Sequence, residues 1–226
     1  MAEKENFFRF CGLLQDIGAK VLREVFFDKY VGISGNSTLA GYLANYKQHL
    51  ASLLPNTLRI EQFDLLYPSS GGAPVIEDLD ITLLCLLFRN LDTQTKSNDS
   101  IWNDPRNHQT YQADVTRIRL IRNKFFGHVS SASMSNAIYN NEVSNLTTIY
   151  QRLVQSLPVG RMSYIALQEL IHKELNDPLT TGLDKEVKRL KEEMQERYRN
   201  GEILKNFLKM IHFALYINQK WSLSYV

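Results

Sequence analysis

The segment ENFFRFCGLLQDIGAKVLREVFFDKY, residues 5–30, sets the fold class. Its apolar side chains recur at steps of three and four residues, which is the repeat of an amphipathic α-helix. We therefore expect one long helix near residues 5–30, ended by a Gly/Ser/Asn loop at residues 32–36. The apolar positions are Phe7, Phe10, Leu14, Ile17, Val21 and Val25.

The rest of the chain continues this helical signal. Ser37 or Thr38 can cap a second helix, which Pro55 ends. The segment ITLLCLLF, residues 81–88, is apolar on all sides and should run through the core. No strand-like alternation of useful length is present, so the predicted fold class is all-α, a helical bundle. Further helices are expected over residues 58–66, from 111 to about 127, and over 135–157, 183–194 and 203–218.

Pro158 and Gly160 mark the expected internal boundary. We expect residues 1–158 to form the helical bundle. We expect residues 159–226 to form a charged C-terminal helical extension, packed on or beside the bundle.

Composition and charge limit the classes of function. A net charge of +2 is too small for wholesale binding of a polyanion, so any nucleic-acid signal must be local. Cys11 and Cys85 lie far apart in apolar runs, which is typical of reduced thiols in a cytosolic protein. We see neither a signal-peptide pattern nor an apolar stretch long enough to span a bilayer. The expected location is cytoplasmic, with no membrane contact.

One arginine lies where packing would favour leucine. On a helical wheel of residues 111–129, Arg122 falls inside the arc of apolar side chains. A guanidinium cannot lose its proton and is costly to bury alone. It therefore needs a carboxylate, a helix end, or a partly wet cleft with a ligand. The arc itself consists of Val115, Ile118, Ile121, Phe125 and Phe126.

His128 follows Arg122 by six residues, which on an unbroken helix turns the two side chains roughly 120° apart. Gly127 is a natural helix terminator, and a chain that leaves the helix there can bring His128 back toward Arg122 or toward a second subunit. An arginine that binds phosphate and a histidine that exchanges a proton near neutral pH are a sufficient minimum for cleaving RNA without a metal.

A local basic face supports this interpretation. Between residues 106 and 128 there is one acid, Asp114, among several cations. Such a face can hold phosphates, and Asn123 can add a hydrogen bond. The cations are Arg106, Arg117, Arg119, Arg122 and Lys124.

Structural interpretations stand beside the functional one. Arg122 can equally be a buried partner of Asp78 or Asp80. A histidine beside a glycine is often only a residue at a helix C-terminus, and Arg117, Arg119 and Lys124 form a solvated face by default. The remaining histidines show no metal-ligand spacing, and phosphate-loop and serine-nucleophile motifs are absent. We therefore expect no metal and no cofactor.

The run Arg122-Asn123-(three residues)-Gly127-His128 resembles the signature of the HEPN family, Arg, four to six residues, then His. The resemblance is closest to the animal branch found in the DAZ-interacting RNA-binding ubiquitin ligase. It extends upstream through ordered motifs and covers about residues 62–128. Zinc ligands of a RING domain are not seen, so ligase activity does not carry over. The upstream motifs are FDLLYP (63–68), DLDITLL (78–84), LFRN (87–90) and ADVTRI (113–118).

This resemblance implies a helical bundle that dimerises, with an arginine and a histidine of each subunit lining a composite cleft. In active members the pair promotes attack of the RNA 2′-hydroxyl on the adjacent phosphodiester without a metal, leaving a 2′,3′-cyclic phosphate. By this resemblance Arg122 would hold the phosphate, His128 would handle the proton, and Asn123 and Lys124 would be supporting contacts.

Two hypotheses follow, because the family also contains members that only bind RNA or serve as interaction modules. The first is an RNA-binding homodimer that cleaves single-stranded RNA, with Arg117 and Arg119 as further RNA contacts. The second is a non-catalytic dimerisation adaptor. The animal branch is often joined to signalling or innate-immunity domains, so the chain can be part of a larger protein.

Overall fold

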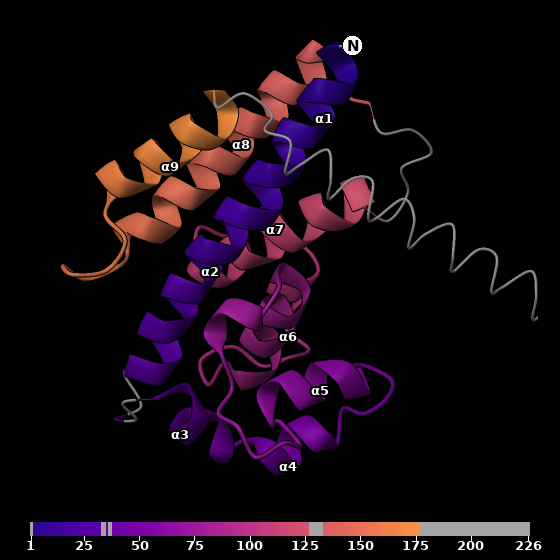
Figure 1. The fold of residues 1–226 in the computed structure, drawn as a ribbon, viewed down its shortest axis with the longest axis vertical. Helices are drawn as coiled ribbons and strands as arrows, with labels where there is room; N and C mark the ends of the chain where they lie inside the picture. Colours follow the sequence, from indigo (N-terminus) through magenta and orange to yellow (C-terminus); the bar gives the residue numbers. More distant parts are fainter. Residues whose placement is uncertain (1, 33–34, 36–37, 127–132, 177–226) are drawn as a thin grey trace, which may run out of the picture. The chain divides into compact units, whose positions relative to one another are not determined.

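The computed structural model describes residues 2–32, 35, 38–126 and 133–176 of the chain. Within these ranges all regular structure is helical and no strand is present, which confirms the predicted all-α class (Figure 1). The helices expected over residues 183–194 and 203–218 lie outside the described residues. None of the described helices is both long and apolar enough to cross a bilayer.

The expected N-terminal helix is interrupted twice. Helix α1 (Ala2–Gly12) passes through a π-helical turn (Leu13–Ile17) into α2 (Gly18–Phe26), and a second π turn (Phe27–Gly32) follows. A π turn inserts one residue into the helical repeat. The hydroxyl of Tyr150, on another helix, donates a 3.1 Å hydrogen bond to the Leu13 carbonyl in the first of these turns. The interruption thus belongs to a helix–helix contact that periodicity does not reveal.

The second expected helix is also divided, into α3 (Leu39–Ala44) and α4 (Lys47–Ala51). Thr38 caps α3, accepting from the Gly41 amide at 3.1 Å. At the break, the Tyr67 hydroxyl donates to the Leu43 carbonyl at 2.7 Å. Helix α5 (Ile60–Leu66) matches the short helix expected before Pro68.

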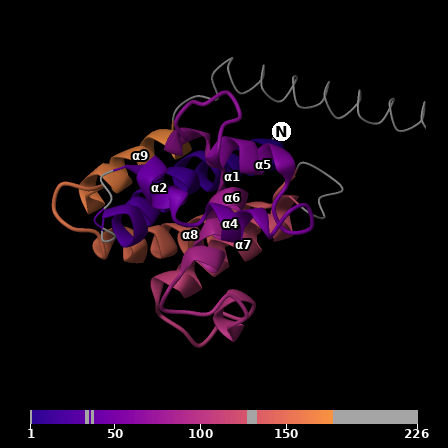
Figure 2. The same ribbon diagram turned by 90° about the horizontal axis from the view of Figure 1, so that it is seen from below.

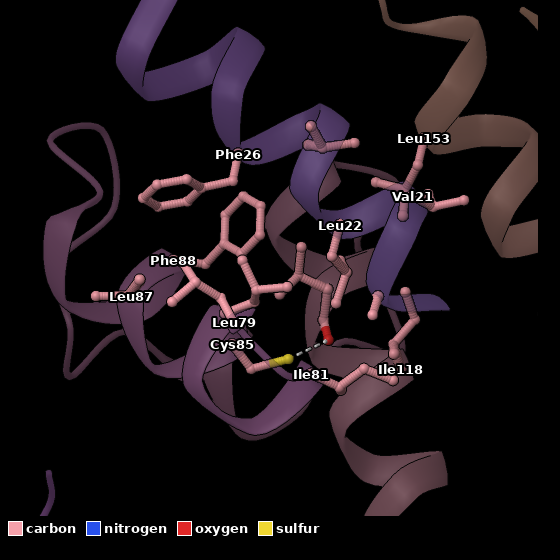
Figure 3. Packing of buried hydrophobic residues seen from close by; sticks show 14 of the residues in the cluster. Val21, Leu22, Phe26, Leu79, Ile81, Cys85, Leu87, Phe88, Ile118 and Leu153 are labelled. Atoms are coloured by element: carbon pink, nitrogen blue, oxygen red, sulfur yellow. Dashed lines mark hydrogen bonds between the residues drawn. The ribbon is translucent and has the colours of Figure 1, made fainter. Parts of the chain in front are cut away.

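Helix α6 (Ile81–Leu91) runs through the core, as its apolar sequence predicts. It packs against α2 and against α7 (Tyr111–Phe126), and Asp80 caps it by accepting from the Leu83 amide at 2.7 Å. Figure 3 shows Phe26 beside Phe88, with ring centroids 5.4 Å apart, and the buried Cys85 thiol directed at the Val115 carbonyl. The α6–α7 connection, which contains a short 3-10 turn (Ser100–Trp102), projects from the body (Figure 2).

Two antiparallel helices complete the described bundle (Figure 1). Helix α8 (Asn136–Gln155) matches the helix expected over residues 135–157; Ser135 caps it, and it packs on α1, α2 and α7. Helix α9 (Tyr164–Asn176) was not expected; it buries Leu167 and Ile171 against α8 and α1. Gly160, at φ +97°, lies in the turn between α8 and α9. Residues up to Asn176 therefore belong to the same compact unit as α1.

Candidate functional site

A cavity of about 490 Å³ opens beside α6 and α7. Its apolar wall consists of Leu53, Ile81, Cys85 and Leu86. Its polar wall consists of Thr57, Thr82, Arg89, Asn90, Ser97, Asn98, Arg119, Arg122 and Asn123. Three guanidinium groups thus line one cavity, and none of its described lining residues is acidic. Such a cavity has the chemistry of an anion site with room for an apolar group.

Arg122 occupies the position that the helical wheel predicts. Val115, Ile118 and Ile121 are buried, and Arg122 is half-buried at the edge of the same arc, where it lines the cavity. Its Nη1 donates to the side-chain oxygen of Asn123 at 3.3 Å.

The ion pair expected by the structural alternative is not formed among the described residues. No carboxylate of the described residues lies within ion-pair distance of the Arg122 guanidinium. Asp80 instead serves as the cap of α6, and Asp78 closes a 3-10 turn. Arg122 therefore lines a partly wet cleft and has no carboxylate partner among the described residues.

Arg119 lies one helical turn before Arg122 and lines the same cavity. Its Nη2 donates to the Trp102 carbonyl in the α6–α7 connection. Partial burial lowers the pKa of Arg119 below its ordinary value, and the nearby positive charge of Arg89 acts in the same direction.

Sequence reasoning missed Arg89 as a member of the site. It lies in the last turn of α6, and its Nε donates to the Ser97 carbonyl at 2.7 Å. The available signal was its place in the LFRN motif, where a cation interrupts an otherwise apolar helix. That signal could not show that α6 brings Arg89 to the cavity of Arg122.

Two of the residues predicted to contact RNA, Arg117 and Lys124, have internal ion-pair partners, and their contact with RNA stays a prediction. Arg117 donates to the buried carboxylate of Asp114 at 2.7 Å and to the Pro105 carbonyl at 2.6 Å. Lys124 Nζ lies 2.6 Å from Glu142 Oε1 on α8. Neither residue lines the cavity, whereas Arg119 and Asn123 both do.

His128 and Gly127 lie outside the described residues. The predicted approach of His128 to Arg122 therefore stays a prediction. Cys85 offers no alternative nucleophile, because burial raises the pKa of its thiol to about 12. Among the residues described, no three His, Cys, Asp or Glu side chains are placed to hold a metal.

Residues 36–179 match a family model, DZIP3/hRUL138-like HEPN. The matched range includes every described residue that lines the cavity, and it continues beyond Pro158 through α9. No curated protein and no solved structure matches the chain.

Proposed function

The chain belongs to the DZIP3/hRUL138-like HEPN family, and from this premise we propose that it binds single-stranded RNA in the cavity lined by Arg122. In a homodimer, Arg122 holds one phosphodiester while the neighbouring 2′-hydroxyl oxygen attacks the phosphorus. His128 takes the hydroxyl proton, the bond to the 5′-oxygen breaks, and the protonated histidine gives a proton to that oxygen. The products are a 2′,3′-cyclic phosphate and a 5′-hydroxyl, and the step needs no metal.

The half-burial of Arg122 without a described acid partner is the observation that carries this proposal. Packing alone would favour an apolar side chain at this position, because a partly buried charge loses hydration. A phosphodiester would supply both the missing negative charge and a bidentate acceptor.

The cavity favours an unpaired strand over a duplex. An RNA double helix presents its phosphates along a broad, rigid surface, whereas a cavity of about 490 Å³ has room for single nucleotides. The apolar wall formed by Leu53, Ile81 and Leu86 can cover an unstacked base while the arginines hold its phosphate. The described lining contains no aromatic side chain for stacking, so phosphate contacts supply most of the expected affinity.

The proposal is tested by measuring how the protein binds and cleaves a labelled ten-nucleotide oligo-uridine in the presence of a metal chelator. We expect Arg122→Ala to weaken binding about tenfold or more, the effect of one lost charge-assisted contact. His128→Ala should bind but not cut. Arg106→Ala is the matched control, because this arginine is exposed, pairs with Asp104 and lies outside the cavity. Equal affinity of wild type and a folded Arg122→Ala variant would refute the proposal.

The dimerisation adaptor remains the competing function. The two functions differ in how RNA changes the melting temperature of the wild type and of Arg122→Leu. An adaptor that uses Arg122 only for its own structure should show no change of melting temperature on addition of RNA. The proposed RNA-binding protein should melt at a higher temperature with RNA, and Arg122→Leu should abolish that shift while leaving the protein folded.

A further inference from the structure

We propose that Arg89 and Arg119 form a second anion subsite, which binds the phosphate next to the one held by Arg122. This inference rests on the proposed function, because it names the ligand of the same cavity more closely. The expected ligand is a strand with at least two consecutive phosphates. Binding of this strand therefore needs side chains of both helices, Arg89 of α6 and Arg119 and Arg122 of α7.

The two arginines reach the cavity from different helices and are held in similar ways. Arg89 Nε is bonded to the Ser97 carbonyl and Arg119 Nη2 to the Trp102 carbonyl, both in the α6–α7 connection. A guanidinium has five N–H donors, and each arginine has one such bond among the described residues. The remaining donors are available to a ligand.

The electrostatic arrangement calls for an anion. Arg89 and Arg119 lie close enough for the charge of Arg89 to lower the pKa of Arg119, and the described lining contains no carboxylate. Two other partly buried arginines of the described residues, Arg117 and Arg152, are matched to Asp114. A third, Arg23, bonds the Glu77 and Leu79 carbonyls and forms no ion pair among these residues, but it does not line this cavity. A phosphate between Arg89 and Arg119 would remove the repulsion between them.

The spacing along α7 separates this pair from Arg122. Arg119 and Arg122 are three residues apart, so they lie on one face with an axial rise of about 4.5 Å. Each arginine side chain is long and flexible enough to carry its guanidinium well away from the helix axis, so the two groups can reach neighbouring phosphates of an unstacked strand. Neighbouring phosphates of one strand can thus meet Arg122 and the Arg89–Arg119 pair at the same time.

The test compares Arg89→Gln, Arg122→Ala and the double variant for binding of ten-nucleotide oligo-uridine at several salt concentrations. Glutamine removes the charge but keeps an N–H group for the Ser97 carbonyl, and Arg89→Ala serves as a second variant. We expect each single change to weaken binding about tenfold and to reduce the slope of log affinity against log salt by about 0.7. In the double variant the two losses of binding free energy should add, which corresponds to about a hundredfold weaker binding, because the arginines hold different phosphates.

A length series separates two subsites from one. Uridine monophosphate should bind much more weakly than the 5′-phosphorylated dinucleotide pUpU, and Arg89→Gln should remove most of that difference. The inference fails if Arg89→Gln and Arg89→Ala bind as wild type does, or if the double variant is no weaker than Arg122→Ala. In both cases a loss of binding in Arg122→Ala would leave the proposed function standing. An unchanged Arg122→Ala would instead overturn the proposed function.

Discussion

Arg152 of α8 donates from Nε to Oδ2 of Asp114 at 2.9 Å, and its Nη2 donates to the other carboxylate oxygen. The Asp114 side chain is 3% exposed and also accepts from Arg117 at 2.7 Å. Arg117 in turn donates to the Pro105 and His108 carbonyls. One buried carboxylate therefore joins α7, α8 and the α6–α7 connection, and so positions the helix that carries Arg119 and Arg122.

Replacing that carboxylate should destabilise the protein strongly. We expect Asp114→Asn to lower the free energy of unfolding by about 3 kcal/mol, because two partly buried guanidinium groups lose their counter-charge. Urea unfolding followed by circular dichroism measures this. Asp104→Asn is the control, since its pair with Arg106 is exposed, and its midpoint should not move. If Asp114→Asn and wild type unfold at the same urea concentration, Asp114 does not stabilise the packing of α7 against α8.

Gly18 should be required by the close approach of α8. A Cβ at Gly18 would lie 2.6 Å from the Tyr150 hydroxyl oxygen, which is fully buried. We expect Gly18→Ala to cost about 1–3 kcal/mol by overpacking, partly offset by the higher helix propensity of alanine. The cost should shrink when Tyr150→Phe removes that oxygen. A double-mutant cycle of thermal unfolding measures the coupling.

Gly12→Ala provides the matched comparison. A Cβ at Gly12 would meet the carboxylate end of Glu174, the far end of a side chain rather than a fully buried ring. The melting temperature of Gly12→Ala should therefore fall less than that of Gly18→Ala. An equal loss at Gly12 and Gly18 would show that helix geometry, not the Tyr150 contact, requires the glycines.

Lys124 should matter for stability although it is largely exposed. Its partner Glu142 is 7% exposed, so Lys124→Ala leaves a buried carboxylate without its cation. We expect a loss of about 1–3 kcal/mol. Glu142→Gln in the same background should recover most of it, because the uncompensated charge is removed. If the double variant is as unstable as Lys124→Ala, the loss is due to packing of the lysine stem.

Alkaline pH should destabilise the protein through its buried thiols. Burial raises the pKa of Cys85 and of Cys11 from 9.0 to about 12. Between pH 9 and pH 12 the unfolded chain has lost these protons while the folded chain retains them. Stability is therefore fully present below pH 9 and falls as pH rises toward 12, by up to about 1.4 kcal/mol per pH unit for each thiol.

Melting temperatures between pH 8 and pH 11 test this pH dependence. Cys85→Ala should make the decline shallower. Leu84→Ala, a neighbouring fully buried site without a titrating group, should lower stability at every pH and leave the slope unchanged. An unaltered slope in Cys85→Ala would exclude Cys85 as a source of the decline.

Patterns within a few residues were sufficient for the helical class, the buried α6 and the place of Arg122 on an apolar arc. They also sufficed for the cap at Thr38. Helical repeats and caps are local, because their hydrogen bonds join residues three or four positions apart. The ordered motifs from residue 63 to 128 carried the family assignment in the same way.

The packed helices were needed to show which charged side chains have an acid partner within the described residues. The local excess of cations predicts Arg117 as an RNA contact, and the structure adds that Asp114 pairs with it. Lys124 is likewise paired, with Glu142. The LFRN motif singles out Arg89 only as a cation in an apolar helix, whereas the structure shows that Arg89 lines the same cavity as Arg119. Such pairings depend on how α6, α7 and α8 cross, and the periodicity of one helix contains no information about the side chains of its neighbours.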